Sequence, residues 1–439
     1  MVQYVFDNTA AVLLILLYMT ERLKGLFLNT KDVEKSAYAW NSFSGLMFAM
    51  QSAVMLIVIT RTNGLEDAGV FSIAYAIGSL MSFIGEYGVR KYQVSDINEK
   101  VSFTDYQSHR VLTCLIMTAV FTVYVLAGYL RGQYSPYKFW VIIFVCLLKL
   151  VEAFSDVYYA RYQQSRRLDV AAKTNTFRIG LAMIACMISL VITHNLLTSV
   201  IIWFAVALIT MCMSSLLVAP EFGGIHFRIN KDALVKLTKE CFPLFVGSFL
   251  LLYIGNAPKY AIDAALDDTA QACYNFIFMP VFVIGLLANF VFNPILVKLA
   301  HKWDRREMKV FTKIVVRQLG VIAAITLLAI AVALTIGCPV LGWLYNADLH
   351  EYKVHLTILM VGGGMLALVN FFTVVVTVVR GQKHLMVGYV AAAVVARLLS
   401  NHFVAKYNIM GATVLYTGLM TLLALVFAVV LIVCVKTKK

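Results

Sequence analysis

The chain has 439 residues, of which 61% are hydrophobic and only 14% are charged. A water-soluble domain of this size has too little interior to remove so much apolar side chain from water, so the composition excludes a soluble globular protein and indicates an integral membrane protein. The formal net charge of +14 does not indicate nucleic-acid binding, because no basic, aromatic-interleaved domain stands outside the loops.

Twelve stretches are long and apolar enough to cross a hydrocarbon layer, which takes about 20 helical residues. A membrane barrel would instead show shorter segments of alternating polarity. The apolar run at 10–19 is too short to span and is expected to lie at the membrane surface. We therefore predict an all-α membrane protein with spans near residues 39–60, 68–87, 110–130, 139–160, 177–194, 197–219, 242–263, 271–297, 314–336, 354–378, 384–404 and 410–435.

The basic residues predict the orientation of these spans. Most of the 37 Lys and Arg fall in loops on one side of the membrane, including the loop at 298–317 and the connection that contains Arg380. By the positive-inside rule, that side and both termini are cytoplasmic. The opposite side holds only Arg61, Arg131, Lys138, Lys353 and Lys406, and three further cations lie within the spans: Lys149, Lys259 and Arg397.

The loop at 221–241 separates six predicted spans from six others. We expect a cytoplasmic or interfacial segment at 1–36, a six-helix lobe at 37–220, a cytoplasmic connector at 221–241 and a second six-helix lobe at 242–439. A weak repeat, LEDAGVF at 65–71 and LDDTAQACY at 266–274, follows the first span of each half. Transporters are commonly built from such repeats, with the substrate path between them.

Polar side chains recur on one face of several spans, at helical steps of three or four. A charge that faces lipid costs about 2.5–3.5 kcal/mol on insertion scales, so these faces are expected to turn toward a shared aqueous cavity. The second span carries Ser72, Tyr75, Ser79, Ser82, Glu86 and Arg90; the fourth carries Lys149, Glu152, Asp156 and Tyr159; the seventh carries Ser248, Asn256, Lys259 and Asp263; and the eleventh carries Arg397.

Each intramembrane charge also has a structural interpretation. Lys259 is one turn from Asp263, so the two could pair, although Pro258 beside it favours an opened helix and a binding role. Lys149 is one turn from Glu152, and an internal pair is the favoured interpretation there. Arg397 fits either an ion pair or an anion site. The acids Glu86, Glu152, Asp156 and Asp263 are candidates for binding a coupling ion.

The sequence contains no pattern for a catalytic or cofactor site. There is no HExxH and no GxxxxGK[ST], and the eight cysteines are scattered along apolar segments. We therefore expect a protein that is not an enzyme and has no cofactor or metal. Coupling to a proton gradient, a sodium gradient or the membrane potential stays open. The segment VGGGM at 361–365 lies inside a span, where glycines favour close helix packing.

Three stretches resemble a known family. They are TRTNGLEDAGVFSIAYAIGSLMSFIGEYGVRKYQVSD at 60–96, NAPKYAID followed by QACYNFIFMPVFVIGLLANFVFNPIL within 256–296, and NIMGATVLYTG at 408–418. Together with the span count, they resemble Wzx-type polysaccharide repeat-unit flippases of the MOP superfamily, which also contains MATE drug antiporters and the lipid II flippase. The resemblance covers roughly residues 36–435.

This resemblance implies two six-helix lobes that move undecaprenyl-diphosphate-linked oligosaccharides across the bacterial cytoplasmic membrane by alternating access, for capsule, exopolysaccharide or O-antigen synthesis. Lys259 matches a position where that family commonly has a cation in its cavity. A diphosphate head needs cations and its sugars need neutral donors and aromatic faces. The candidate substrate-binding residues are accordingly Lys259, Arg397, Arg90 and Lys149 for phosphate and Asn256, Tyr260, Tyr75 and Tyr274 for sugar.

The expected partners are the lipid-linked oligosaccharide and membrane lipids, with a polysaccharide polymerase and chain-length machinery as further candidates. Two alternatives stay open. A MATE-like cation-coupled drug or metabolite antiporter would have an acidic, apolar pocket. A membrane polysaccharide polymerase would need a sizeable external loop, and the longest predicted here, about 337–353, is modest.

Overall fold

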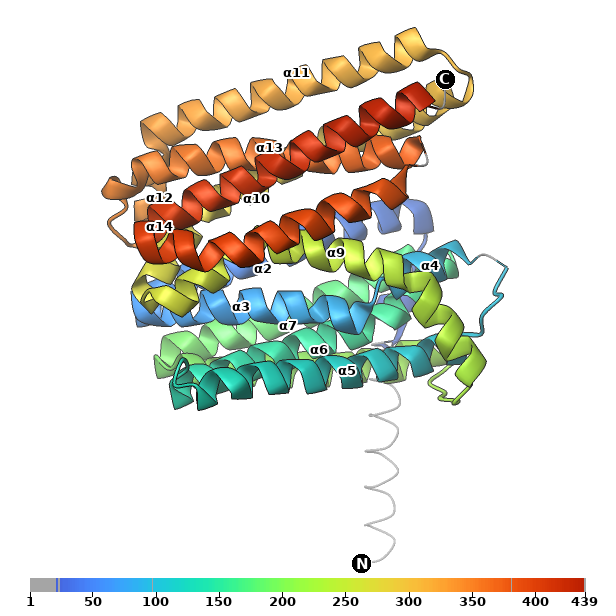
Figure 1. Ribbon diagram of the computed structural model, residues 1–439. Helices are drawn as coiled ribbons and strands as arrows, with labels where there is room; N and C mark the ends of the chain where they lie inside the picture. The colour runs from blue at the N-terminus through green and yellow to red at the C-terminus, as the bar shows by residue number, and fades with distance from the viewer. Residues whose placement is uncertain (1–20, 23, 97, 380, 438–439) are drawn as a thin grey trace, which may run out of the picture. The chain divides into compact units, whose positions relative to one another are not determined.

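The computed structural model describes residues 21–437 except Leu23, Ile97 and Arg380, and it leaves out the side chains of 286–298, 300, 382, 383 and 437. The predicted surface segment at 10–19 and the predicted cytoplasmic residue Arg380 lie outside the described residues. All regular secondary structure in the described part of the chain is helical (Figure 1), which confirms the predicted all-α class.

The helices follow one another through mostly short connections. Their bounds are α2 Val33–Asn63, α3 Leu65–Glu86, α4 Val89–Ser95, α5 Phe103–Leu130, α6 Pro136–Gln164, α7 Leu168–Thr193, α8 Leu196–Val218, η1 Ala219–Phe222, α9 Lys231–Ala265, α10 Asp268–Asp304, α11 Met308–Val332, η2 Ala333–Gly337, α12 Cys338–Tyr345, η3 His350–Tyr352, α13 Lys353–Val378 and α14 Gln382–Thr437.

Nine helical stretches of the described chain are long and apolar enough to cross a membrane, so the protein is a multi-pass membrane protein. One of them, α14, has 56 residues, or about 84 Å at helical rise against a hydrocarbon layer of about 30 Å. It folds back on itself at Asn408, where φ is 52° and ψ is −137° (Figure 1). It therefore contains two spans, while the full count of twelve stays a prediction.

Several helices extend beyond the predicted spans. α5 begins at Phe103 rather than near 110, and α7 begins at Leu168 rather than near 177. Arg110 and Arg178, which the sequence places at the cytoplasmic ends of their predicted spans, consequently lie inside helices. Hydropathy misses these helix ends because they carry charged residues that are paired inside the fold.

The chain forms two compact units. Unit 1 comprises the chain up to Met55, Met81–Leu130 and Phe139–Phe245; unit 2 comprises Leu56–Leu80, Arg131–Lys138 and Val246–Lys439. Boundaries fall inside α2, α3, α6 and α9, so each of these helices contributes to both units. The predicted lobes at 37–220 and 242–439 stay a prediction.

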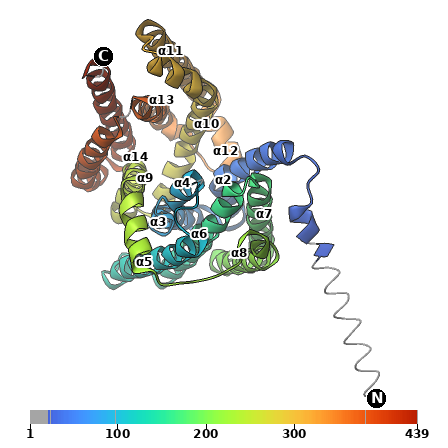
Figure 2. The ribbon, with the colours of Figure 1, turned by 90° about the vertical axis from the view of Figure 1, so that its right-hand side faces the viewer.

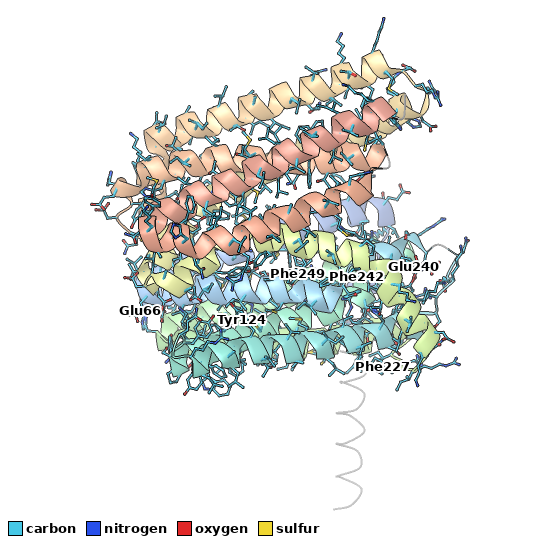
Figure 3. The ribbon with its side chains drawn as sticks, in the orientation of Figure 1. Glu66, Tyr124, Phe227, Glu240, Phe242 and Phe249 are labelled. Atoms are coloured by element: carbon cyan, nitrogen blue, oxygen red, sulfur yellow. The ribbon has the colours of Figure 1, made fainter. Side chains whose placement is uncertain are left out.

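An aromatic cluster forms part of the core of unit 1. Tyr106 of α5 and Tyr158 and Tyr162 of α6 are buried together with Leu237 of α9. Other positions of α5 expose apolar side chains, among them Tyr124, which is 42% exposed (Figure 3). This distribution is typical of a helix with one face in the protein and one in lipid.

The three glycines of the VGGGM segment let three helices approach α13 in unit 2. A methyl group at Gly362 would lie 2.8 Å from the ring of Tyr416 on α14, and one at Gly363 would lie 2.9 Å from Ile284 on α10. A methyl group at Gly364 would collide with Thr326 on α11. The predicted role of these glycines in close helix packing is confirmed.

We predict that Gly362→Ala lowers the free energy of unfolding by about 1–3 kcal/mol, because α13 and α14 must move apart to admit the methyl group. Thermal unfolding in detergent measures the effect. Gly418→Ala on α14 is the matched control, since a methyl group there meets nothing within 4 Å. Equal unfolding temperatures for the two variants would contradict the packing argument.

Candidate functional site

The polar faces of the second and fourth predicted spans form two ion-pair clusters in unit 1. In the first, Asp156 Oδ1 lies 3.1 Å from Arg90 Nη1 and its Oδ2 lies 3.0 Å from Arg110 Nη2. Arg110 also donates to the Gly85 carbonyl at 2.6 Å. The Arg110 side chain is 0% exposed, so Asp156 supplies the charge that keeps this cation in the interior.

The second cluster lies one turn earlier on α6. Glu152 Oε2 is 2.7 Å from Lys149 Nζ, which confirms the predicted pair, and its Oε1 is 3.7 Å from Arg178 Nη1. Gln51 Nε2 donates to the same Oε1 at 3.4 Å. Both cations are buried. A single carboxylate therefore serves two cations, as Asp156 does in the first cluster.

Glu86 differs from the other two acids of these clusters. Its carboxylate, at the end of α3, is half-buried and makes no hydrogen bond or ion pair with any residue that the structure describes. The nearby Arg110 is already held by Asp156. Glu86 is thus chemically available for a proton or a cation, and its ion-coupling role stays a prediction.

Lys259 lies on the part of α9 that belongs to unit 2 and is 5% exposed. Its ammonium has no ion-pair partner and no hydrogen-bond acceptor among the described side chains and backbone. Instead, Nζ lies 4.6 Å from the ring centroid of Phe278 and 6.0 Å from that of Phe282, both on α10. The aromatic faces attract the cation but do not neutralise it.

The Phe278 ring connects Lys259 to two tyrosines. Tyr274 stacks against this ring at a centroid distance of 5.7 Å, and Tyr416 meets it edge-on at 4.8 Å. Both tyrosine hydroxyls are buried without a hydrogen-bond partner in the described chain. A buried unsatisfied polar group costs about 1–3 kcal/mol, so a ligand that offered acceptors here would gain that energy.

Asn256 and Tyr260 flank Lys259 on α9. Asn256 is buried, and the Tyr260 hydroxyl donates to the Ala76 carbonyl of α3 at 3.2 Å. Tyr75, the residue before Ala76, is half-buried. Unit 2 therefore brings α3 beside the stretch of α9 that carries the candidate sugar-binding residues.

Asp263 does not form the alternative pair with Lys259. Its Oδ1 lies 2.7 Å from Lys138 Nζ, which also lies 2.6 Å from Asp268 Oδ1. The Tyr134 hydroxyl donates to Asp263 Oδ2 at 3.2 Å. The negative charge one turn from Lys259 is thus neutralised by another cation, and Asp263 remains only a predicted ion-coupling residue.

Arg397 lies on α14 between the exposed side chains of Val394 and Leu398 and is itself exposed. It makes no ion pair within the part of the chain that the structure describes. The ion-pair interpretation of Arg397 is therefore not supported, and an anion-binding role stays a prediction.

Sequence reasoning missed three buried cations that organise these clusters: Arg110, Arg178 and Lys138. All three stand near the ends of apolar stretches, where the positive-inside rule treats a cation as a loop residue. A usable signal existed for Arg178, because it stands inside the predicted span at 177–194; in the structure it donates a hydrogen bond to Asn175 at 2.8 Å. Lys138 offered no comparable signal in the sequence.

Residues 36–300 match the model of a family described as polysaccharide biosynthesis protein. The chain belongs to this family. A curated relative is the capsular polysaccharide biosynthesis protein CapF of Staphylococcus aureus, which is 22% identical over 383 residues, or 85% of this chain and 93% of CapF.

Two solved structures share the fold. The lipid II flippase MurJ in an inward closed conformation matches with a TM-score of 0.69 over 90% of this chain and 86% of MurJ. A multidrug resistance MATE family transporter in an inward-facing conformation matches with a TM-score of 0.64 over 89% of this chain and 94% of the transporter. Both are 12% identical. The likeness confirms the predicted MOP-superfamily fold of this family member.

We predict that Asp156→Asn lowers the free energy of unfolding by about 3–5 kcal/mol, because Arg110 is left buried without its counter-charge. Glu86→Gln is the matched control from the same unit and is expected to change it by less than about 1 kcal/mol, since no pair is broken. Thermal unfolding of the purified variants in detergent compares them. A larger loss of stability for Glu86→Gln than for Asp156→Asn would refute the conclusion that Asp156, and not Glu86, is the counter-ion of Arg110.

Proposed function

We propose that this protein moves undecaprenyl-diphosphate-linked oligosaccharide repeat units from the inner to the outer leaflet of the bacterial cytoplasmic membrane, by alternating access, for surface polysaccharide synthesis. Membership of the polysaccharide biosynthesis family supports the pathway, and CapF is a relative named for capsular polysaccharide. The fold shared with a lipid II flippase is compatible with a lipid-linked cargo. The observation that carries the proposal is that Lys259 is buried without a counter-ion among the described residues.

A buried cation without a counter-ion is unfavourable in the membrane interior, and it persists where a function requires it. The aromatic faces of Phe278 and Phe282 offset part of that cost, by about 0.5–2 kcal/mol for a cation over a ring. They leave the positive charge uncompensated. A diphosphate would supply the missing negative charge, with charge-assisted hydrogen bonds from the ammonium.

The neutral groups around Lys259 fit the sugars of such a cargo. Asn256 offers an amide one turn away, and Tyr274 offers a hydroxyl that has no other partner in the described chain. Tyr260 and Tyr75 add aromatic surface. Amide, hydroxyl and aromatic groups bind sugar hydroxyls and sugar faces without a fixed charge. Arg90 and Lys149 are already paired with carboxylates, so we assign them a weaker role in binding phosphate.

The membrane potential can drive this transport without ATP. With both termini and a negative potential on the cytoplasmic side, each negative charge moved outward gains about 2.3 kcal/mol per 100 mV. Glu86 is the acid best placed to couple the movement to a proton or a sodium ion, because it alone among the acids of the two unit 1 clusters lacks a partner in the described residues. The protein itself would perform no chemical step on the sugar.

The charge around Lys259 argues against the main alternative. A drug or metabolite antiporter for organic cations would need an uncompensated carboxylate at its binding site. Asp263 is one turn from Lys259 but is held by Lys138. The uncompensated charge there is therefore positive, which favours an anionic cargo. Transport of a cationic dye that lipid-linked sugars do not inhibit would favour the antiporter instead.

We predict that Lys259→Met lowers transport of the lipid-linked repeat unit roughly 10- to 100-fold, because a charge-assisted hydrogen bond contributes about 1.5–3 kcal/mol. Accumulation of repeat units on the inner leaflet measures the loss. Unfolding temperature should not fall, since no ion pair is broken. Lys259→Arg should retain part of the activity, because it keeps the charge.

Lys236→Met is the matched control for Lys259→Met, because Lys236 is an exposed lysine of the same helix. It should leave both transport and stability unchanged. Normal transport by a folded Lys259→Met protein would remove Lys259 from the site and the main support for an anionic cargo.

Arg397→Gln should lower transport by at most about fivefold, because an exposed charge contributes up to about 1 kcal/mol. Transport by wild type and by this variant, assayed at low and high salt, measures the contribution. The wild type should show the larger salt effect if Arg397 attracts an anion. Equal salt dependence in both would assign Arg397 no part in binding.

A further inference from the structure

An exposed strip of cations runs along α11 and takes no part in the site around Lys259. Lys309, Lys313 and Arg317 are spaced four residues apart, so they lie on one helical face over about 12 Å of the axis. All three side chains are exposed. None forms an ion pair within the described part of the chain. We call these three residues the basic strip.

Local structure does not account for the basic strip. The neighbouring Glu307 pairs with Lys302, so it is not the counter-ion of the strip. Lys309 stands in the first turn of α11, where a cation opposes the helix dipole rather than complementing it. The three cations therefore do not stabilise the helix through ion pairs. Their charges are available to an anionic partner outside the protein.

The same face of α11 continues as an apolar surface beyond Arg317. Ala323, Ala324 and Leu327 are exposed on it, and so is Gly320, where the space beside the backbone is open. Only 11% of the most apolar stretch of this span is buried. Within unit 2, α11 packs on α10 and α13 (Figure 2). Its remaining surface is therefore a face for lipid, with the cations at one end.

We propose that the basic strip binds the head group of an anionic phospholipid, whose acyl chain lies along the exposed face from Gly320 to Leu327. Charge complementarity carries the assignment, because three unpaired cations at one end of an apolar face match a phosphate above a hydrocarbon chain. A phospholipid fits this surface because the exposed apolar face that continues from the cations can hold an acyl chain, as the bilayer does.

Photo-crosslinking in nanodiscs tests the proposal with the full-length protein. The nanodiscs contain phosphatidylcholine with about 20% phosphatidylglycerol, and either lipid carries a diazirine on its acyl chain; each cation near the surface is expected to favour the anionic lipid about fivefold. Peptide mass spectrometry then measures labelling of residues 308–327. The anionic probe should label this segment more strongly than the neutral probe, and high salt should reduce the difference.

The triple variant Lys309→Gln/Lys313→Gln/Arg317→Gln should lose the preference for the anionic probe. The matched control, Lys231→Gln/Lys236→Gln/Lys239→Gln, removes three exposed lysines of α9 and should keep it. Equal labelling of the segment by both probes in the wild type would overturn the proposal. So would an unchanged preference in the α11 variant, or displacement of the phospholipid by an equimolar prenyl diphosphate, which would make the strip a cargo site. Transport by the Lys259 variants reports on the proposed function separately.

Discussion

A charge in the membrane interior needs an opposite charge beside it, and the arrangement of this protein follows from that constraint. In unit 1 two carboxylates on successive turns of α6 each hold two cations. Asp156 holds Arg90 and Arg110, and Glu152 holds Lys149 and Arg178. Three other helices, α4, α5 and α7, are thereby tied to α6 by ion pairs, and the side chains of Arg110, Lys149 and Arg178 are buried. The pairing explains how helices that carry so many charges can span a membrane.

Unit 2 satisfies the same constraint differently. Lys138 joins Asp263 and Asp268, which belong to the end of α9 and the start of α10. Close helix contact is provided by Gly362, Gly363 and Gly364 rather than by charge. Lys259 is left with aromatic rings and no anion in the described chain. A carboxylate within reach of Lys259 would stabilise the empty protein, but it would also compete with a phosphate.

The sequence predicted what depends on local pattern and missed what depends on tertiary pairing. Hydropathy was sufficient for the all-α class, and spacing of one turn was sufficient for the Lys149–Glu152 pair. The repeated steps on the second and fourth spans identified Glu86, Arg90 and Asp156, although not which cation each acid holds. The buried positions of Arg110 and Lys138 are not predicted, because a cation at the end of an apolar stretch has the same sequence pattern whether it meets water or a buried carboxylate.

The cations of this chain thus divide by what compensates them. Arg110, Arg178 and Lys138 are paired with carboxylates and hold helices together, so their removal is expected to lower the free energy of unfolding. Lys259 and the basic strip of α11 have no counter-ion in the described chain. Their removal relieves unfavourable charge and is expected to weaken the binding of an anionic ligand. A family member that paired every cation would be more stable when empty, yet it would offer no positive charge to an anionic lipid. Keeping Lys259 unpaired lowers the stability of the empty site, and the bound anion then restores what was lost.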